Sequence, residues 1–229
     1  MGLNIYNTDS YQILQIPNGY RGISNEYFSQ FCTFHGIPII APALINEYAL
    51  KEARYILERM FENCEHRISP LRENGLFVAI MPEALMTDAA GMYNPLREQN
   101  YSYAAVGEDN ILTGYSSVLI HEIAHALHHS LSQFEKEIIL EYFEASKAYY
   151  KSDAYAVQNV YEYFAESVGA YFCAGTLKET INNRKALQVF DSKIYHYVDG
   201  IFGNTPYIWT PVAERKDDLH LIGYKPKEI

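Results

Sequence analysis

The residues of this chain whose types and spacing could carry chemistry form an H-E-x-x-H motif at His121, Glu122 and His125. The flanks are apolar and contain no Pro or Gly, so the segment is predicted to be a helix. Residues four apart lie on one helix face, so both imidazoles can point at one position in space. Glu122 lies about 100° round the helix from His121, within reach of a water molecule held there. The motif therefore predicts a zinc site with Glu122 as general base.

A catalytic zinc site has three protein ligands and one open position, so a third ligand is needed. The metzincin pattern H-E-x-x-H-x-x-G-x-x-H does not fit, because His128 and Leu131 stand where its Gly and last His belong. His129 is excluded too, since it lies about 12 Å along the helix axis from His121. We expect His128 and His129 to lie around the metal ligands or to face solvent.

A carboxylate from a later helix is the remaining option. The segment from Asn159 to Val168 is predicted to be helical, with Asn159 as its N-cap. Glu162 and Glu166 are four residues apart on one face of this helix. On this pattern either glutamate can be the ligand, and Glu162 can instead complete a capping box with Asn159.

The later helix also carries a family resemblance. Tyr155, followed by Glu162-Tyr-Phe-Ala-Glu166 after H-E-x-x-H, resembles the catalytic domain of anthrax lethal factor and its relatives, which include the secreted Pro-Pro endopeptidases. The resemblance covers about residues 35–172, and the two zinc-binding segments are its specific part. It identifies the chain as similar to the gluzincins, which bind zinc through two His of the motif helix and a Glu of a later helix.

The resemblance implies a zinc endopeptidase acting on a peptide or protein substrate, with one Zn²⁺ per chain. In that family the first Glu of E-x-F-A-E binds the metal, and a Tyr seven residues earlier stabilises the oxyanion. The implied metal ligands are His121, His125 and Glu162. The implied catalytic residues are Glu122 and Tyr155, with Glu166 in a supporting role.

The composition limits the partners. A net charge of −10 argues against binding to nucleic acid or to anionic membrane surfaces. No apolar run approaches the ~18 residues of a membrane span, and the first twenty residues show no signal-peptide pattern. The resemblance nonetheless suggests a secreted or host-delivered protein. Three scattered cysteines are too few for a disulfide scaffold, so we expect Cys32, Cys64 and Cys173 to be buried and structural.

The first half of the chain is predicted to supply the sheet and one core helix. The pattern indicates a short strand at Gln12–Ile16, a helix at Ser24–Phe34 and an extended segment at Ile37–Pro42. An apolar stripe predicts a core helix at Asn46–Phe61. The continuous apolar run Leu76–Met81 predicts a central strand buried on both faces.

Residues 82–115 show no clear periodicity, and we expect the substrate groove there. Tyr101–Val106 or Ile111–Thr113 could form an edge strand that pairs with the substrate backbone. Asp88 and Glu108 are candidate partners of the ligating histidines, although turn-forming or solvated roles are the simpler interpretation.

Three helices are predicted after the motif helix, at about 134–150, 159–174 and 187–202, followed by a loop-like tail. The sequence thus predicts an α+β fold, with residues 1–229 as a single zincin-like domain. A small mixed sheet carries the active-site helix, and the C-terminal half is helical. Two alternatives to an endopeptidase stay open: a non-peptidase zinc amide or ester hydrolase, and a binding or adaptor domain that retains a peptidase fold.

Overall fold

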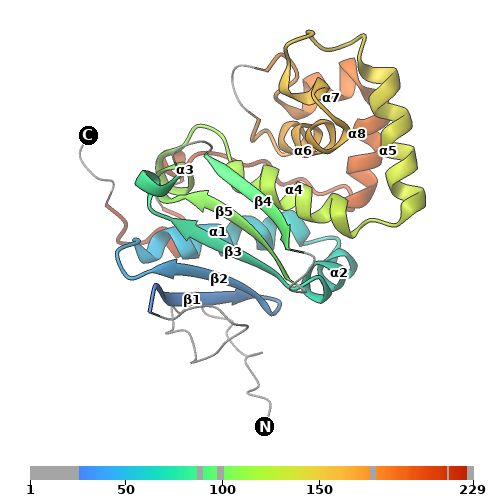
Figure 1. The fold of residues 1–229 in the computed structure, drawn as a ribbon. Helices are drawn as coiled ribbons and strands as arrows, with labels where there is room; N and C mark the ends of the chain where they lie inside the picture. Colours follow the sequence, from blue (N-terminus) through green and yellow to red (C-terminus); the bar gives the residue numbers. More distant parts are fainter. Residues whose placement is uncertain (1–25, 87–89, 97–100, 176–178, 216, 226–229) are drawn as a thin grey trace.

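The computed structural model describes residues 26–86, 90–96, 101–175, 179–215 and 217–225 (Figure 1). A twisted sheet forms one part of the molecule, and helices α5 to α8 gather at the other (Figure 1). The strand expected at residues 12–16 lies outside the described residues.

In the described part of the chain, the sheet has five strands in the order β1-β2-β3-β5-β4. Strands β2, β3 and β5 are parallel to one another, and the edge strands β1 and β4 are antiparallel to their neighbours. The central position of β3 confirms the prediction from its apolar sequence. The strands are β1 (Phe28–Phe34), β2 (Ile37–Pro42), β3 (Leu76–Met81), β4 (Gly91–Leu96) and β5 (Tyr101–Gly107).

The first strand corrects the sequence analysis, which predicts a helix over residues 24–34. Phe28–Phe34 instead pairs with β2 in a hairpin, with Phe34 opposite Ile37. His35 (φ 45°) and Gly36 (φ 83°) turn the chain through two left-handed positions. A two-residue turn of this kind matches the twist of antiparallel strands, so strand pairing overrides the weak helical pattern.

The region from residue 82 to 115 contains two strands and a helix. A strand does form at the predicted Tyr101–Val106, as β5, but it lies between β3 and β4 and is not an edge strand. Ile111–Thr113 belongs to helix α3 (Glu108–Thr113). The edge strand of this region is β4, which was not expected from its sequence. Its Gly, Asn and Pro disfavour strands in general, yet an edge strand tolerates Pro.

Helices α1 (Glu47–Phe61) and α4 (Val118–Ser130) cover one face of the sheet. The first lies over β1 and β2, and the second lies over β4 and β5. The short helix α2 (Ile68–Glu73) packs beside β3 and α4. Asn46 caps α1 by accepting a hydrogen bond from the Tyr48 amide (3.1 Å).

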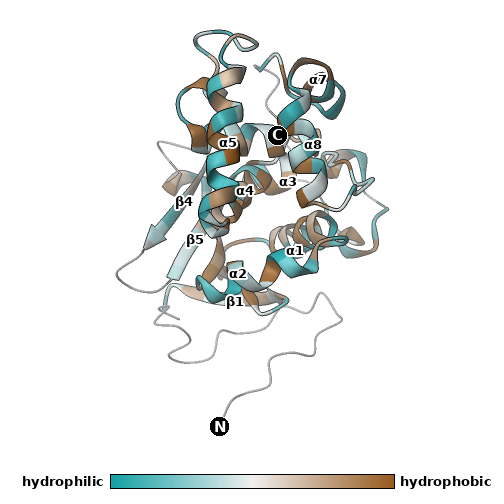
Figure 2. Ribbon diagram, turned by 90° about the vertical axis from the view of Figure 1, so that its right-hand side faces the viewer, coloured by the Kyte–Doolittle hydropathy of each residue, from teal (hydrophilic) through white to brown (hydrophobic). Residues whose placement is uncertain are grey.

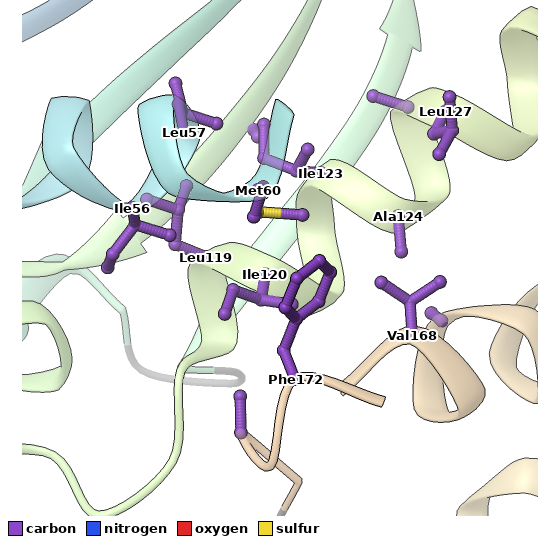
Figure 3. Close-up of a cluster of buried hydrophobic side chains, with 14 of the residues drawn as sticks. Ile56, Leu57, Met60, Leu119, Ile120, Ile123, Ala124, Leu127, Val168 and Phe172 are labelled. Carbon is purple, nitrogen blue, oxygen red and sulfur yellow. The ribbon is translucent and has the colours of Figure 1, made fainter. Parts of the chain in front are cut away.

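The core is built around α4 (Figure 3). Its apolar side chains meet those of α1 on one side and those of α6 on the other. All of the labelled residues are fully buried, and burial stabilises each large apolar side chain by about 1.5–3 kcal/mol. The motif helix is therefore held rigidly by residues that have no chemical role. Those labelled are Ile56, Leu57, Met60, Leu119, Ile120, Ile123, Ala124, Leu127, Val168 and Phe172.

The C-terminal half is helical, as predicted. Figure 2 shows hydrophilic and hydrophobic residues alternating along α5, as expected for a helix with one buried face. The single helix expected over residues 187–202 is instead two helices. The α-helices that the structure describes in this half are α5 (Gln133–Ser146), α6 (Val160–Tyr171), α7 (Arg184–Phe190) and α8 (Ser192–Ile201).

Asp191 separates α7 from α8, because its backbone (φ −138°, ψ 67°) is not helical. Its buried carboxylate accepts a hydrogen bond from Tyr163 Oη on α6 (2.8 Å). The break therefore places an acceptor against the helix that carries Glu162 and Glu166.

The segment after α8 packs back against α1. Glu52 of α1 is fully buried and forms an ion pair with Arg215. Its second oxygen lies 2.6 Å from His220 Nε2, and the His220 ring stacks on Tyr55 at 4.2 Å. The tail expected to be loop-like is thus anchored to the core.

The predicted α+β class, with a small mixed sheet, a motif helix packed on it and a helical C-terminal half, is confirmed. Cys32 and Cys64 are buried as expected, whereas Cys173 is half-buried, and all three are free thiols. Burial raises the pKa of Cys32 and of Cys64 to about 12, so both are inert at neutral pH. Within the described ranges, no helix is long and apolar enough to cross a membrane.

Candidate metal centre

Helix α4 presents two of the three predicted ligands. Ser117 caps the helix by accepting a hydrogen bond from the Ile120 amide (3.4 Å). With the apolar side of α4 in the core, His121 and His125 lie half-buried on the opposite side and face the cleft. Their Nε2 atoms are 3.0 Å apart, as expected for residues one turn apart on a single helix face.

Helix α6 carries two carboxylates near the motif, those of Glu162 and Glu166. The side chain of Asn159 accepts hydrogen bonds from the amides of Tyr161 and Glu162 (both 3.0 Å) and caps the helix. Helices α4 and α6 pack together, which places the Glu162 side chain over the motif. Glu162 Oε2 is 3.1 Å from His121 Nε2 and 3.5 Å from His125 Nε2.

The three side chains His121, His125 and Glu162 form the one cluster with metal-ligand chemistry among the described residues. Two ligand atoms that each lie 2.0–2.1 Å from a tetrahedral zinc ion are about 3.3–3.4 Å apart. The observed separations of 3.0, 3.1 and 3.5 Å are close to this spacing. The donor set and its geometry therefore fit a zinc ion.

The carboxylates of Glu162 and Glu166 stabilise positive charge at the His121 ring. Burial alone would lower the pKa of His121, but hydrogen bonds with Glu162 and Glu166 raise it to about 10. Burial opposes ionisation of Glu162, yet hydrogen bonds with His121 and His125 hold the pKa of its carboxyl at about 2. Glu162 is thus an anion at neutral pH, as a metal ligand must be.

Glu166 occupies a different position from Glu162. Its Oε1 lies 3.0 Å from Nδ1 of His121, the ring nitrogen that does not face the other two side chains. A carboxylate on the second nitrogen is the usual partner of a histidine that binds a metal.

Glu122 lies beside the cluster and is 6% exposed. Burial raises the pKa of Glu122, against the opposing effect of His121, of His125 and of a hydrogen bond from the Tyr93 backbone N–H. A raised pKa suits a carboxylate that must take up a proton and release it again. The contact with Tyr93 joins α4 to β4, and nothing local in the sequence indicates it.

Tyr155 stands at the mouth of the site and is 44% exposed. Its ring centroid is 6.1 Å from that of His121, and the Tyr155 amide donates a hydrogen bond to Glu179 Oε1 (3.1 Å). Burial and the nearby Glu162 raise the pKa of Tyr155. The phenol therefore keeps its proton at neutral pH and can donate a hydrogen bond.

His128 and His129 differ from expectation in part. His128 is 3% exposed, and its ring packs against Tyr161 and Phe164. His128 is therefore buried, although it still borders the larger cavity beside the site. His129 Nδ1 lies 2.7 Å from the Tyr93 hydroxyl, and the Tyr93 ring is parallel to that of His125 at 6.4 Å.

The carboxylates beside His121 are those of Glu162 and Glu166, whereas Glu108 lies at the start of α1. It is buried, and its Oε1 accepts a hydrogen bond from the Asn46 amide (2.8 Å) at the start of α1. Its role as a partner of the ligating histidines is therefore wrong, and Glu166 occupies that position instead. Asp88, the other candidate, lies outside the described residues.

The cluster opens into two cavities. The larger has a volume of about 740 Å³ and extends over β4, the end of α4 and the start of α5. The smaller, of about 390 Å³, lies toward the start of α4 and the end of α6. Both are lined by Gly91, His121, Glu122 and Tyr155, so the candidate centre lies between them.

The sequence matches no protein-family model and no curated protein. Among solved structures, the chain is similar to that of the Pro-Pro endopeptidase PPEP-2 from Paenibacillus alvei. The two share 18% sequence identity with a TM-score of 0.48, over 73% of this chain and 97% of that chain.

Proposed function

We propose that this chain is a zinc-dependent endopeptidase and that residues 1–229 form one zincin-like domain. In this proposal His121, His125 and Glu162 bind a single Zn²⁺ ion, Glu122 is the general base and Tyr155 is the oxyanion donor. The observation that carries it is the 3.0–3.5 Å triangle of ligand atoms beside a buried carboxylate.

Each residue has a chemical task in the proposed reaction. Zinc, when bound, acts as a Lewis acid on the scissile carbonyl and makes water a better nucleophile. Glu122 accepts the proton of the attacking water and delivers it to the leaving amine. Tyr155 donates a hydrogen bond to the oxygen on which negative charge develops, a contact worth roughly 3–4 kcal/mol in known enzymes. Glu166 fixes the orientation of the His121 ring.

The shape of the cleft supports an endopeptidase. The two cavities continue on either side of Glu122, so a chain can extend in both directions from the scissile bond. Strand β4 borders the larger cavity, and its outer edge has no strand partner among the described residues. An extended peptide can add to such an edge by backbone hydrogen bonds.

The test is digestion of a proteome-derived peptide library by the zinc-loaded protein, read by mass spectrometry. We expect internal cleavage that a chelator abolishes and that Zn²⁺ restores. Glu122→Gln should retain zinc and lose turnover by about 10²–10⁴-fold.

Other outcomes separate the alternatives. Hydrolysis of small esters or amides without peptide cleavage would indicate a non-peptidase hydrolase. A protein that binds no zinc at neutral pH would point to a binding or adaptor domain. Full activity of Glu122→Gln would refute its assignment as the general base.

A further inference from the structure

Strand β4 passes unusually close to α4 at the residue assigned as general base. A Cβ atom added to Gly91 would lie 2.8 Å from Glu122 Oε1 and 3.0 Å from Glu122 Cγ, and it would overlap Val118 Cγ1. Distances under about 3 Å are closer than real Cβ contacts. Only glycine therefore lets the strand approach the Glu122 side chain to this distance.

The pairing of β4 with β5 also fixes which backbone N–H groups of β4 point toward β5 and which point outward. Ala90 O accepts a hydrogen bond from the Gly107 amide (3.2 Å), and Gly91 pairs with Val106. Because the bonding direction alternates along an antiparallel strand, Asn94 bonds toward β5 and Tyr93 points its N–H away from the sheet. Pro95, which has no N–H, occupies another outward position.

The outward N–H of Tyr93 donates to the Glu122 carboxylate. We propose that strand β4 is the positioning element for Glu122, through the Tyr93 amide and the close approach that Gly91 permits. This inference rests on the proposed function, since it concerns the same general base. A carboxylate has two oxygens, so one can accept from the amide while the other takes the proton of the attacking water.

The amide contact restrains a side chain that would otherwise be free to rotate. Glu122 has three rotatable side-chain bonds, so a contact at its carboxylate decides where the two oxygens lie. Misplacing a catalytic group by about 1 Å can cost about 10²-fold in rate. The Tyr93 amide is also unavailable to a substrate strand at this position, because Glu122 already accepts from it.

The first test deletes one backbone N–H and leaves every side chain in place. Tyr93 is replaced by its α-hydroxy acid through nonsense suppression, which converts the amide to an ester. The matched control is the same replacement at Asn94, whose N–H bonds within the sheet. Both proteins are loaded with zinc, crystallised, and assayed on a peptide that the wild type cleaves.

At Tyr93 we expect the Glu122 carboxylate to move, and kcat to fall about 10²-fold, with KM within about twofold and full zinc content. At Asn94 we expect an unmoved carboxylate and an unchanged kcat, despite some loss of stability. An unmoved Glu122 in the Tyr93 ester would overturn the inference, whether or not the protein proves to be a peptidase. An inactive wild type would instead defeat the proposed function.

A second test uses Gly91→Ala. Because the added Cβ also overlaps Val118, the single variant can fail to fold, so it is made in a Val118→Ala background. Relative to Val118→Ala alone, the double variant should keep its zinc, displace the Glu122 carboxylate and lose about 10²-fold in kcat. Equal kcat and an unmoved carboxylate in the two proteins would contradict the role of Gly91.

Discussion

Glu166 Oε1 lies 3.0 Å from Nδ1 of His121, on the far side of the ring from the nitrogen that faces Glu162. Two glutamates one turn apart on α6 thus contact the two nitrogens of one imidazole. Since a histidine binds a metal through one nitrogen and is oriented through the other, this arrangement fits the proposed roles of Glu162 as ligand and Glu166 as the group that orients the ring.

The two glutamates should differ in their effect on zinc binding. Glu162→Ala removes a proposed ligand, so the variant should not retain stoichiometric zinc after dialysis. Glu166→Ala should bind zinc about 10–100-fold more weakly than the wild type, as measured by competition with a chromophoric chelator. Glu137→Ala, an exposed glutamate in the same cleft, is the control. Zinc loss in Glu166→Ala alone would reverse the two assignments.

Tyr155→Phe should lower kcat by about 10²–10³-fold with unchanged zinc content, because the proposed donor is lost and no ligand is touched. Tyr161→Phe is the matched control, since Tyr161 lines the same cavity and is more exposed. Steady-state kinetics on a cleaved peptide give the comparison. Equal rates for Tyr155→Phe and the wild type would transfer the oxyanion role to another group.

Glu52→Gln should destabilise the protein by about 3 kcal/mol or more, because it leaves the partly buried Arg215 without its main counter-charge. Glu47→Gln, on the same helix, breaks the surface pair with Lys51 and should cost less than about 1 kcal/mol. Urea unfolding of both variants measures the free energies. Similar values for the two would show that the buried ion pair stabilises the protein no more than the surface pair does.

His128 should make the protein sensitive to mild acid. Burial lowers its pKa to about 4 in the folded chain, against about 6.5 when unfolded. As the pH falls, His128 is therefore protonated first in the unfolded state. The stabilisation from the neutral, buried His128 is fully present above pH 6.5 and is lost as the pH drops toward 4. The loss attributable to this group is roughly 2–3 kcal/mol.

His128→Phe should remove that part of the pH dependence, because the ring already packs on Tyr161 and Phe164 and its Nε2 has no hydrogen-bond partner among the residues that the structure describes. Both proteins are unfolded in urea with a chelator present, so that metal release at low pH does not enter the comparison. If the free energies of unfolding of the wild type and of His128→Phe fell by the same amount between pH 6.5 and 4, the prediction would be contradicted.

The sequence predicted the helices that carry the site because their signals are local. The spacing of His121 and His125, and the N-cap Asn159 before Glu162, each depend on one turn of helix. The choice between Glu162 and Glu166 is not local. It depends on how α6 packs against α4, which no periodicity within either helix specifies.

Strand β4 could not be predicted because its stability comes from its neighbour. The residues Gly91, Asn94 and Pro95 argue against a strand when taken alone, and each is accommodated by an edge position beside β5. The break between α7 and α8 at Asp191 could not be predicted for a similar reason. The apolar pattern continues through it, and its partner Tyr163 lies 28 positions earlier in the chain.

The pairing of Glu52 with Arg215 and His220 bears on the order of events during synthesis. These contacts span 163 and 168 positions, so α1 emerges from the ribosome long before the groups that neutralise its carboxylate. Until Arg215 and His220 have been translated, α1 can be buried only with the Glu52 carboxylate unpaired. Burying an unpaired charge is costly. Consolidation of the core is therefore deferred until these later residues have been made, and a chain interrupted before Arg215 would be a ready substrate for quality-control proteolysis.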